Sequence, residues 1–411
     1  RSLPGSAGMI SICFYFEVHQ PFRLRKYGFF DLGNSNYFDD EANARIAEKV
    51  ANKCYRPTTS LLYELVRRHG DQFRFTFSVT GTAIEQFKRW TPDVMDLFRA
   101  LAETGRVEFL AETYYHSLAS LFSESEFRHQ VRMHSDLMYN EFGVRPTSFR
   151  NTELIYNNHI AYLAEDMGFS AILCEGAERL LGWRSPNYLY RPRYSPRIKA
   201  FLKNYRLSDD IAFRFSDRGW LEFPLTTEKF ATWLHNVAGN GNVVNLFMDY
   251  ETFGEHQWED TGIFKFLDAL PNALLRHRDF RFSTVTEAAR QREPVGEIDT
   301  DQAVSWADME RDLSAWLGNS MQREAAASIY ELERDVKEIN DPDMLDDWRK
   351  LQTSDHFYYM STKFWNDGDV HKYFSPYGTP HEAYVYFMNV LQDLRNRIKQ
   401  RKKTEAHAQK N

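Results

Sequence analysis

The segment ISICFYFEVHQP, residues 10–21, decides the fold class. Its first seven residues are mostly β-branched, aromatic or otherwise apolar, which is typical of a strand with both faces buried. Glu17 and His19 follow where this run ends. Strands buried on both faces belong to parallel sheets covered by helices, so the segment indicates an α/β protein with polar chemistry at a strand end.

The same pattern recurs along the chain. Six further runs alternate with amphipathic stretches: FRFTFSVTG (73–81), RVEFLAET (106–113), TSFRNTE (147–153), SAILCEG (170–176), NVVNLFMDYE (242–251) and FRFSTVTEA (280–288). Helical periods fit between them at 59–70, 83–90 and 125–143, and Gly143 suits the end of the last helix. The sequence therefore predicts seven β/α units in succession.

Polar residues and a glycine gather at the carboxyl ends of these runs. They are Glu17 with His19, Gly81, Glu112, Glu153, Glu175, and Asp249 with Glu251. A β/α barrel builds its active site at this end of its strands. Because no phosphate-binding glycine motif follows any run, the pattern favours a barrel over an open doubly wound sheet.

The chain is expected to divide into four parts. Residues 1–8 precede Met9, which looks like a natural start, and we interpret them as an artificial or disordered leader. Residues 9–300 form the barrel, and residues 301–398 form a C-terminal helical domain, because helical periods replace the strand runs there. Residues 399–411 are a polar tail without an apolar face, which we expect to be frayed and solvated.

Composition argues against several classes of protein. Lys and Arg number 51 and Asp and Glu number 58, so the formal net charge is −7, without long blocks of one sign. This balance disfavours nucleic acid or an anionic membrane as the main partner. No apolar run approaches the roughly 20 residues of a membrane helix, and the three scattered cysteines suggest neither a disulfide framework nor a zinc ribbon. We expect a cytoplasmic protein that needs no metal or other cofactor.

Two strand ends carry the candidate catalytic residues. FRNTELIYNN (149–158) contains Glu153, and FMDYETFGEHQW (247–258) contains Asp249 and Glu251. A lone glutamate after a strand most often caps a loop or forms an ion pair. Carboxylates at two ends of one barrel mouth, beside aromatic residues that can stack on sugar rings, instead suit glycosidic bond cleavage, which needs a nucleophile and a proton donor.

The same residues resemble a known family. HQP (19–21), VEFLAETYYH (107–116), FRNTELIYNN (149–158), MDYETFGEHQ (248–257) and WADMERDLSAWLGNSMQ (306–322) are similar, in this order, to the five signature regions of family-57 glycoside hydrolases. They most resemble the α-amylase subgroup. The resemblance runs from Met9 to about residue 395.

This resemblance implies an incomplete (β/α)7 barrel with a C-terminal helical domain, acting on α-1,4- and α-1,6-linked glucans with retention of configuration. It also implies that Glu153 is the nucleophile and Asp249 the acid/base. The predicted function is therefore retaining hydrolysis of α-1,4-glucosidic bonds in α-glucans or maltooligosaccharides.

Further polar residues are predicted to bind substrate: His19, Gln20, Glu112, His116, Arg150, Asp210, Glu251, His256, Trp306 and Asp308. Family members can carry a carboxylate where His116 stands, so this position departs from the pattern. Asp210 is also an alternative acid/base, although an Asp-Asp pair more often forms a turn or a cap. Arg150 could hold the pKa of Glu153 down, unless strand alternation points its side chain elsewhere.

Other functions stay open. A 4-α-glucanotransferase of the same family would use the same covalent intermediate and pass the sugar to a hydroxyl group instead of water. A branching enzyme would generally carry longer insertions than this chain has. A metal-dependent carbohydrate deacetylase would need an Asp and two His as ligands, and no H-x-x-x-H spacing occurs at a strand end. A non-catalytic glucan-binding protein is disfavoured because both carboxylates are present. The oligomeric state is left open.

Overall fold

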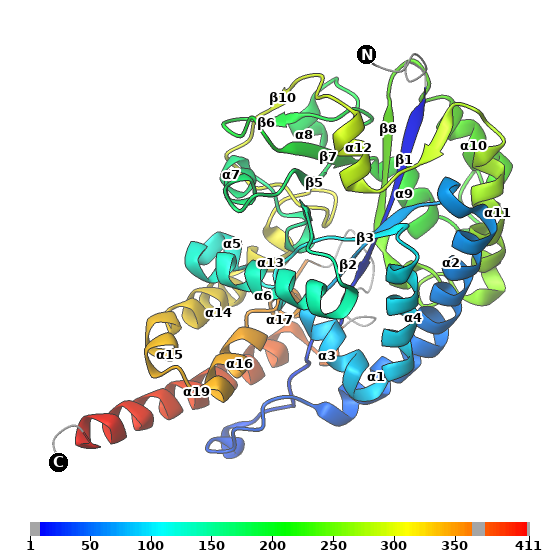
Figure 1. Ribbon diagram of the computed structural model, residues 1–411. Coiled ribbons are helices and arrows are strands. Elements are labelled where there is room, and N and C mark those ends of the chain that lie inside the picture. The colour runs from blue at the N-terminus through cyan, green and yellow to red at the C-terminus, as the bar shows by residue number, and fades with distance from the viewer. Residues whose placement is uncertain (1–8, 364–374, 409–411) are drawn as a thin grey trace.

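The computed structural model describes residues 9–363 and 375–408, and Figure 1 shows their arrangement. The leader predicted at residues 1–8 lies outside the described residues. Two parallel sheets stand beside each other, and helices surround them.

The first sheet is built around the opening segment of the chain. It contains β1 (Ile10–Val18), β2 (Phe75–Val79), β3 (Val107–Phe109) and β8 (Val243–Asp249) in the order β3-β2-β1-β8, all parallel. Every residue of β1 is buried, as its apolar run predicts. In the register of this sheet, Glu17 stands opposite Ser78 on one side and Asp249 on the other. The ends of three strands therefore meet at one level.

The second sheet supplies the remaining strands of the barrel. It contains β4 (Ser148–Phe149), β5 (Ala171–Glu175) and β7 (Lys199–Lys203), again parallel and in the order β4-β5-β7. An isolated bridge between Ala111 and Phe149 joins it to the strand region after β3, and the amide of Asn204 donates to the carbonyl of Asn245 at 2.9 Å beside β8. The ladder is interrupted at both joins, which confirms the predicted incomplete barrel.

The seventh strand of this barrel differs from the prediction. The run at 280–288 forms only the short β9 (Phe280–Phe282), which pairs with the start of β1, and its remainder begins α12 (Val285–Gln291). Lys199–Lys203 supplies β7 instead. Its sequence, KAFLK, has lysines at both ends and only three apolar residues, so it carries no strand signal of its own. Pairing with β5 makes it a strand.

Helices cover the outside of both sheets. They are α1 (Asp40–Val50), α2 (Arg56–His69), α3 (Gly81–Trp90), α4 (Pro92–Glu103), α5 (Ala119–Phe122), α6 (Glu124–Phe142), α7 (Asn158–Asp166), α8 (Glu178–Leu181), α9 (Tyr205–Ala212), α10 (Thr227–His235), α11 (Ile263–Leu275) and α12. Gly143 follows α6 with a φ of 77°, a left-handed conformation that suits glycine and ends the helix as predicted. A two-stranded sheet of β6 (Arg191–Pro192) and β10 (Glu297–Ile298) adjoins the barrel at β7, where Tyr190 forms an isolated bridge with Ala200.

The chain beyond the barrel is helical, as predicted. It forms α13 (Ser314–Leu317), α14 (Ser320–Tyr330), α15 (Glu333–Ile339), α16 (Pro342–Lys350), α17 (Ser354–Tyr358) and α19 (Pro380–Ala408), which gather at the lower left of Figure 1. Residues 399–408, assigned above to a polar tail, continue α19 with mostly exposed side chains. Trp348 and Phe387 share one apolar core with the barrel residues Phe149 and Tyr156. The C-terminal helices therefore pack against the barrel and share one hydrophobic core with it.

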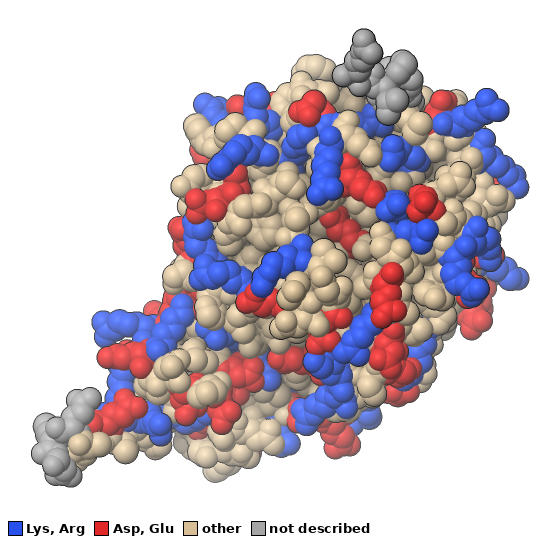
Figure 2. Space-filling view, in the orientation of Figure 1, with Lys and Arg blue, Asp and Glu red and all other residues tan. Residues whose placement is uncertain are grey.

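Surface charge and hydropathy agree with the composition. Acidic and basic side chains are interspersed over the face shown in Figure 2. Within the residues that the structure describes, no helix is long and apolar enough to cross a membrane.

Candidate active site

Charged residues converge where the strands of the barrel end. Arg150 follows β4, is fully buried, and donates through Nη2 to Oε2 of Glu17 at 2.6 Å. Its Nη1 lies 3.9 Å from Oε2 of Glu112, and its guanidinium faces the ring of Trp306 at 5.0 Å. A buried cation needs such carboxylate partners, because burial without them is costly. The charges among the apolar residues of 149–158 thus belong to a network inside the barrel mouth.

Glu153 is held by three hydrogen-bond donors from three different segments. Nε2 of His116 lies 2.9 Å from its Oε1, and the hydroxyl of Ser354 donates to the same oxygen at 2.9 Å. The indole Nε1 of Trp306 donates to Oε2 at 2.7 Å. These contacts fix both oxygens of the carboxylate.

The backbone at this site is strained. Glu153 has φ 58° and ψ 24°, and His116 and Asp308 also have positive φ, at 51° and 58°. Residues other than glycine rarely adopt this left-handed conformation, and such strain gathers at functional sites. The amide of Trp306 donates to the carbonyl of Glu153 at 3.2 Å, which helps to hold the strained peptide.

The pKa values of the Glu153 and Asp249 carboxyl groups are shifted in opposite directions. Burial alone would raise the pKa of Glu153, but the adjacent His116 and, to a lesser extent, Arg150 lower the pKa to about 2. For Asp249, burial raises the pKa above its usual value and the charge of Glu153 adds to this, while His256 opposes it. One ionised carboxylate and one carboxyl group with an enhanced affinity for its proton therefore share the barrel mouth.

Glu251 lies in a hydrogen-bonded chain beside Asp249. The hydroxyl of Tyr55 donates to its Oε1 at 2.5 Å, and Nε2 of Gln20 donates to that hydroxyl at 2.9 Å. Burial, reinforced by the charge of Asp249, raises the pKa of Glu251 to about 8. Tyr55 ends a π-helical turn, Ala51–Tyr55, between α1 and α2. Such turns often occur at functional sites, but the sequence pattern did not single out Tyr55.

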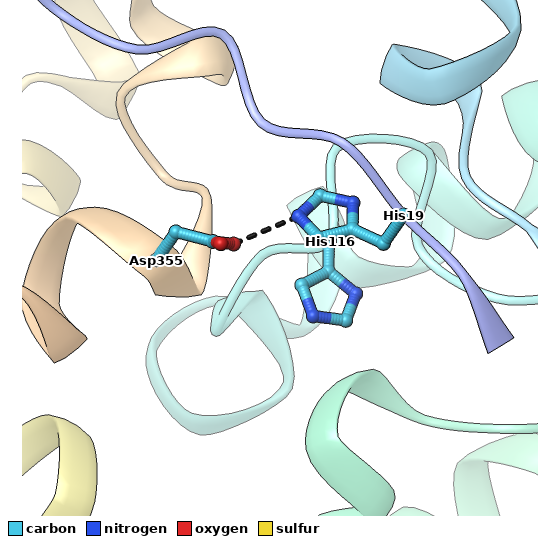
Figure 3. Close-up of side chains that lie close together, drawn as sticks. All are labelled: His19, His116 and Asp355. Atoms are coloured by element: carbon cyan, nitrogen blue, oxygen red, sulfur yellow. Dashed lines mark hydrogen bonds and ion pairs between the residues drawn. The ribbon is translucent and has the colours of Figure 1, made fainter. Parts of the chain in front are cut away.

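Two histidines and an aspartate also meet here, as Figure 3 shows. Ligand atoms of His19, His116 and Asp355 lie within 4.8 Å of one another, so the residue set required for the deacetylase alternative does occur, although from three separate segments. The two imidazoles, however, are stacked at 3.9 Å with an interplanar angle of 23°. Ring nitrogens of stacked imidazoles point side by side and do not converge on one ion.

Three of the four ring nitrogens also lie within hydrogen-bond distance of a protein partner, and the fourth, Nδ1 of His116, only approaches a carboxylate oxygen. Nδ1 of His19 lies 3.0 Å from the hydroxyl of Thr80, and Nε2 lies 2.7 Å from Oδ1 of Asp355. Nε2 of His116 faces Glu153, as above, and Nδ1 lies 3.3 Å from Oε1 of Glu17. Burial lowers the pKa of His116 to about 4, which keeps this imidazole neutral near pH 7. The group fits a hydrogen-bonded network better than a metal centre.

We therefore expect that chelation leaves the activity unchanged. For the glucan hydrolysis that the sequence predicts, kcat on a maltooligosaccharide after treatment with EDTA and dialysis should stay within about twofold of the untreated value, because two carboxyl groups can supply that chemistry without a Lewis acid. Elemental analysis of the purified protein checks the same point independently. Near-stoichiometric zinc whose removal abolishes activity would contradict this expectation and favour the metal-dependent alternative.

The other predicted binding residues lie at different distances from this network. Glu112 is buried next to Arg150, and burial raises its pKa. Asp308 forms an ion pair with Lys363 at 3.1 Å. Asp210 pairs with Arg214 one helical turn later, at 2.6 Å, and not with Arg150 or the histidines of this network. Its surroundings are those of a structural helix ion pair.

Several residues of the network were not among the predicted site residues. Glu17 has a visible signal, because it ends the first apolar run beside His19. Lys203 ends β7, lies 5.4 Å from the ring of Trp306, and was missed with its strand. Ser354 and Asp355 begin α17, where serine and aspartate are common as helix-start residues, so no sequence signal distinguishes them.

Comparison with known proteins shows the family to which this chain is similar. The model of the family described as "Glycosyl hydrolase family 57" matches residues 13–301. A protein of Methanocaldococcus jannaschii named "Putative alpha-amylase" is 46% identical over 404 residues, which cover 95% of this chain and 85% of that protein.

Solved structures agree on the fold. A family-57 branching enzyme from Thermococcus kodakaraensis matches with a TM-score of 0.67 at 15% identity, over 95% of this chain and 94% of its own. A 4-α-glucanotransferase from Thermococcus litoralis matches with a TM-score of 0.65 at 16% identity, over 85% of this chain and 56% of its own. At such low identity these likenesses bear on the architecture alone.

Proposed function

The chain belongs to glycosyl hydrolase family 57, and on that premise we propose that it hydrolyses α-1,4-glucosidic bonds of α-glucans or maltooligosaccharides, with Glu153 as nucleophile and Asp249 as acid/base. The observation that carries this proposal is the opposite tuning of the two groups. The pKa of Glu153 is low because hydrogen-bond donors and positive charge surround it, and the pKa of Asp249 is raised by burial.

These two states are the ones that a retaining mechanism requires. The Glu153 carboxylate attacks the anomeric carbon and forms a glycosyl ester, while Asp249 gives its proton to the departing glycosidic oxygen. Asp249 then takes a proton from water, which attacks the same carbon and releases Glu153. Each step inverts the carbon once, so the product keeps the configuration of the substrate.

The choice of an α-glucan as substrate rests on relatives. The protein that is 46% identical to this chain is named for α-amylase activity. Hydrolysis, branching and 4-α-glucan transfer are the activities to distinguish within the family. All three activities share one glycosyl-enzyme and differ in what intercepts it, water or a sugar hydroxyl group. Hydrolysis is the activity that we propose.

A maltooligosaccharide series distinguishes these outcomes. With maltoheptaose as substrate, we expect shorter sugars only and a rise in reducing ends that matches the number of bonds cleaved, because water accepts the glucosyl group. Chromatography of the products over time, with a reducing-sugar assay on the same samples, makes the measurement. Sugars longer than the substrate, formed without new reducing ends, would show that transfer dominates.

A further inference from the structure

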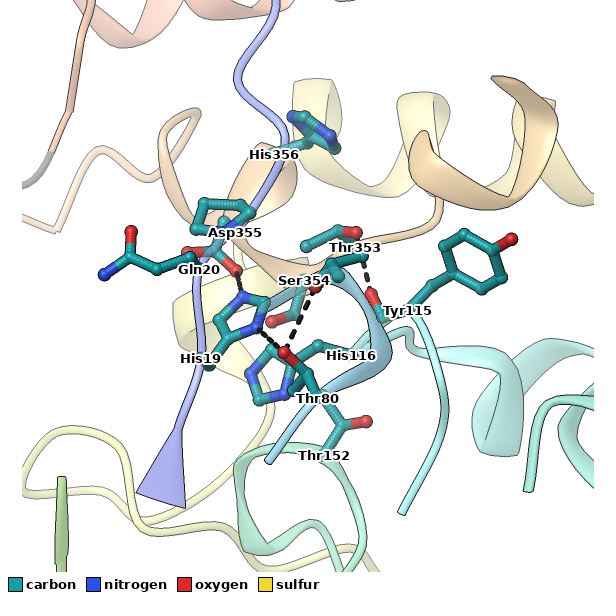
Figure 4. Close-up of polar contacts among 12 residues, drawn as sticks. His19, Gln20, Thr80, Tyr115, His116, Thr152, Thr353, Ser354, Asp355 and His356 are labelled. Carbon is teal, nitrogen blue, oxygen red and sulfur yellow. Dashed lines mark hydrogen bonds and ion pairs between the residues drawn. The ribbon is translucent and has the colours of Figure 1, made fainter. Parts of the chain in front are cut away.

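The start of α17 enters the active site from the helical part of the chain. Ser354 is fully buried, and its hydroxyl reaches Glu153. Asp355 beside it reaches His19, as Figure 4 shows. Ser354 and Glu153 are 201 positions apart in the sequence. The helical part therefore supplies atoms to the site and does more than cover it.

The backbone holds α17 in register with the turn that carries His116. The amide of Ser354 donates to the carbonyl of His116 at 2.8 Å, and the hydroxyl of Thr353 donates to the carbonyl of Tyr115 at 2.7 Å. Ser117 and Thr353 also form an isolated antiparallel bridge. Because the Ser354 amide and the Thr353 hydroxyl both bind main-chain carbonyls of the turn that carries His116, the Ser354 hydroxyl and the His116 imidazole approach Glu153 as one rigid unit.

The donors leave one lone pair of the carboxylate unused. An ionised carboxylate offers about four lone-pair directions, two on each oxygen. His116 and Ser354 both bind Oε1, and Trp306 binds Oε2. Among the described residues, one direction on Oε2 therefore remains for the substrate.

Asp355 does not contact Glu153 and instead binds His19. Its Oδ1 accepts from Nε2 of His19 at 2.7 Å, while the Thr80 hydroxyl faces the other ring nitrogen. The His19 ring is held from both sides and stacks on the His116 ring, with the ring centroids 3.9 Å apart. This stacking fixes the orientation of the His116 ring. Burial opposes the ionisation of Asp355, but the neighbouring His19 lowers its pKa below the usual value, so it stays an acceptor.

We propose that Ser354 and Asp355 are positioning residues for the Glu153 carboxylate, Ser354 by binding Oε1 directly and Asp355 through the stacked His19 and His116, and that Oε2 is the oxygen that attacks. This inference rests on the proposed role of Glu153. When Oε2 bonds to the anomeric carbon, Oε1 becomes the carbonyl oxygen of the glycosyl ester and loses most of its negative charge. When water releases the sugar, that charge returns to Oε1, where Ser354 and His116 stabilise it.

This sequence of charges makes the two steps respond differently to Ser354→Ala. A donor to Oε1 stabilises the free carboxylate before attack, so its removal costs the first step little beyond orientation. The second step regenerates the carboxylate and loses the full stabilisation. Breakdown of the glycosyl-enzyme should therefore slow by about tenfold or more, as for loss of a hydrogen bond to a charged group.

α-Maltosyl fluoride as substrate measures both steps. For Ser354→Ala we expect kcat about tenfold lower, with KM falling alongside, so that kcat/KM stays within about threefold of wild type. Acid-quenched samples should show by intact mass a larger fraction of glycosyl-enzyme than wild type. Ser328→Ala, a buried serine in α14, is the matched control and should behave as wild type. Ser354→Thr keeps the hydroxyl group and should restore much of kcat.

Equal losses of kcat and kcat/KM in Ser354→Ala, with no gain of glycosyl-enzyme, would overturn the inference and leave Ser354 a structural residue. This outcome is distinct from failure of the proposed function. If the wild type forms no glycosyl-enzyme on Glu153, both ideas fail together. If it does form one and Ser354→Ala leaves that fraction unchanged, only the positioning role fails.

A double-variant cycle tests Asp355. Asp355→Ala and His19→Ala should each lower kcat/KM, and the double variant should lose no more than the worse single variant, because the two residues act in one chain. Asp355→Asn keeps an acceptor oxygen and should lose less than Asp355→Ala. If the losses of the two alanine variants multiply in the double variant, Asp355 does not act through His19.

Discussion

Glu153→Gln should abolish turnover of α-glucans while the protein remains folded. The amide keeps the size of the side chain and an acceptor oxygen for Trp306 or His116, but it cannot attack the anomeric carbon. We expect kcat to fall by more than about a hundredfold, the lower end of the effect of losing even a single proton-transfer group. Steady-state kinetics on a maltooligosaccharide measure this fall, and thermal melting confirms the fold. More than about a hundredth of wild-type kcat would exclude Glu153 as nucleophile.

Glu108→Gln is the matched control for this variant. Glu108 lies near the start of β3, where its carboxylate accepts from the amide of Thr286 at 3.1 Å, away from the barrel mouth. Burial raises the pKa of Glu108 to about 7, so a neutral amide is a close substitute. We expect its kinetics to match those of the wild type.

Glu153→Gly extends the test by opening the nucleophile pocket. Glycine adopts φ 58° without strain, so the change should not disturb the backbone at this position. Azide can then enter and attack the anomeric carbon from the side that Glu153 left, while Asp249 protonates the departing oxygen. The expected product from an α-glucan is the β-glycosyl azide, which NMR identifies. An α-azide, or rescue of Glu153→Gln to a product of retained configuration, would contradict the assignment.

Asp249→Asn should slow the cleavage of poor leaving groups far more than that of good ones. A sugar hydroxyl needs a proton in order to leave, whereas fluoride or an activated phenolate leaves as a stable anion. We expect kcat/KM on maltooligosaccharides to fall by about 10²- to 10⁴-fold, and kcat/KM on α-maltosyl fluoride to change much less. The comparison of the two substrates is the measurement.

Asp210→Asn is the control, and it also tests the competing assignment. Asp210 pairs with Arg214 on α9, so its loss should affect both substrates alike and modestly. If dependence on the leaving group appeared in the Asp210 variant and not in the Asp249 variant, the acid/base would be Asp210.

The dependence of kcat/KM on pH also tests the assignment of Asp249 as the acid/base. Asp249 acts as an acid only while protonated, and burial raises its pKa, so kcat/KM should fall as the pH rises through that raised value. Glu153 acts only while ionised, and its pKa of about 2 keeps it so throughout the usual range. On maltooligosaccharides, whose leaving group needs a proton, Asp249→Asn should therefore flatten the alkaline limb, whereas the wild type acting on α-maltosyl fluoride should show little of this limb. An unchanged alkaline limb would mean that another group sets it.

Much of the barrel follows from sequence, but β7 does not. β1, β2, β5 and β8 each contain at least five consecutive residues that are buried or nearly so, and such runs are visible as continuous apolar segments. β4 also lies within a predicted run, 147–153, although only two of its residues join the ladder. β7 is bounded by lysines, and its strand conformation depends on pairing with β5, which a local pattern cannot show.

The candidate catalytic pair was found because both residues follow such apolar runs. Glu153 stands four residues after the end of β4 and Asp249 ends β8, and a parallel arrangement brings these strand ends to one edge. Two alternatives were open for Arg150, and both hold in part. Its side chain points to Glu17, which it binds at 2.6 Å, and its charge still lowers the pKa of Glu153. The direction of a side chain after a strand of two residues depends on packing, not on alternation.

The sequence by itself determined the class of fold, the end of the barrel that holds the site and the two carboxylates proposed for catalysis, because buried strands and the residues that end them are local features of a chain. Only the tertiary structure decided how those carboxylates differ. The pKa of Glu153 is low because His116 lies against it, and Ser354 and Trp306 donate to it from segments far along the chain. Electrostatic and hydrogen-bond interactions depend on distance in space, so no local pattern could have shown that the pKa of Glu153 is lowered while that of Asp249 is raised.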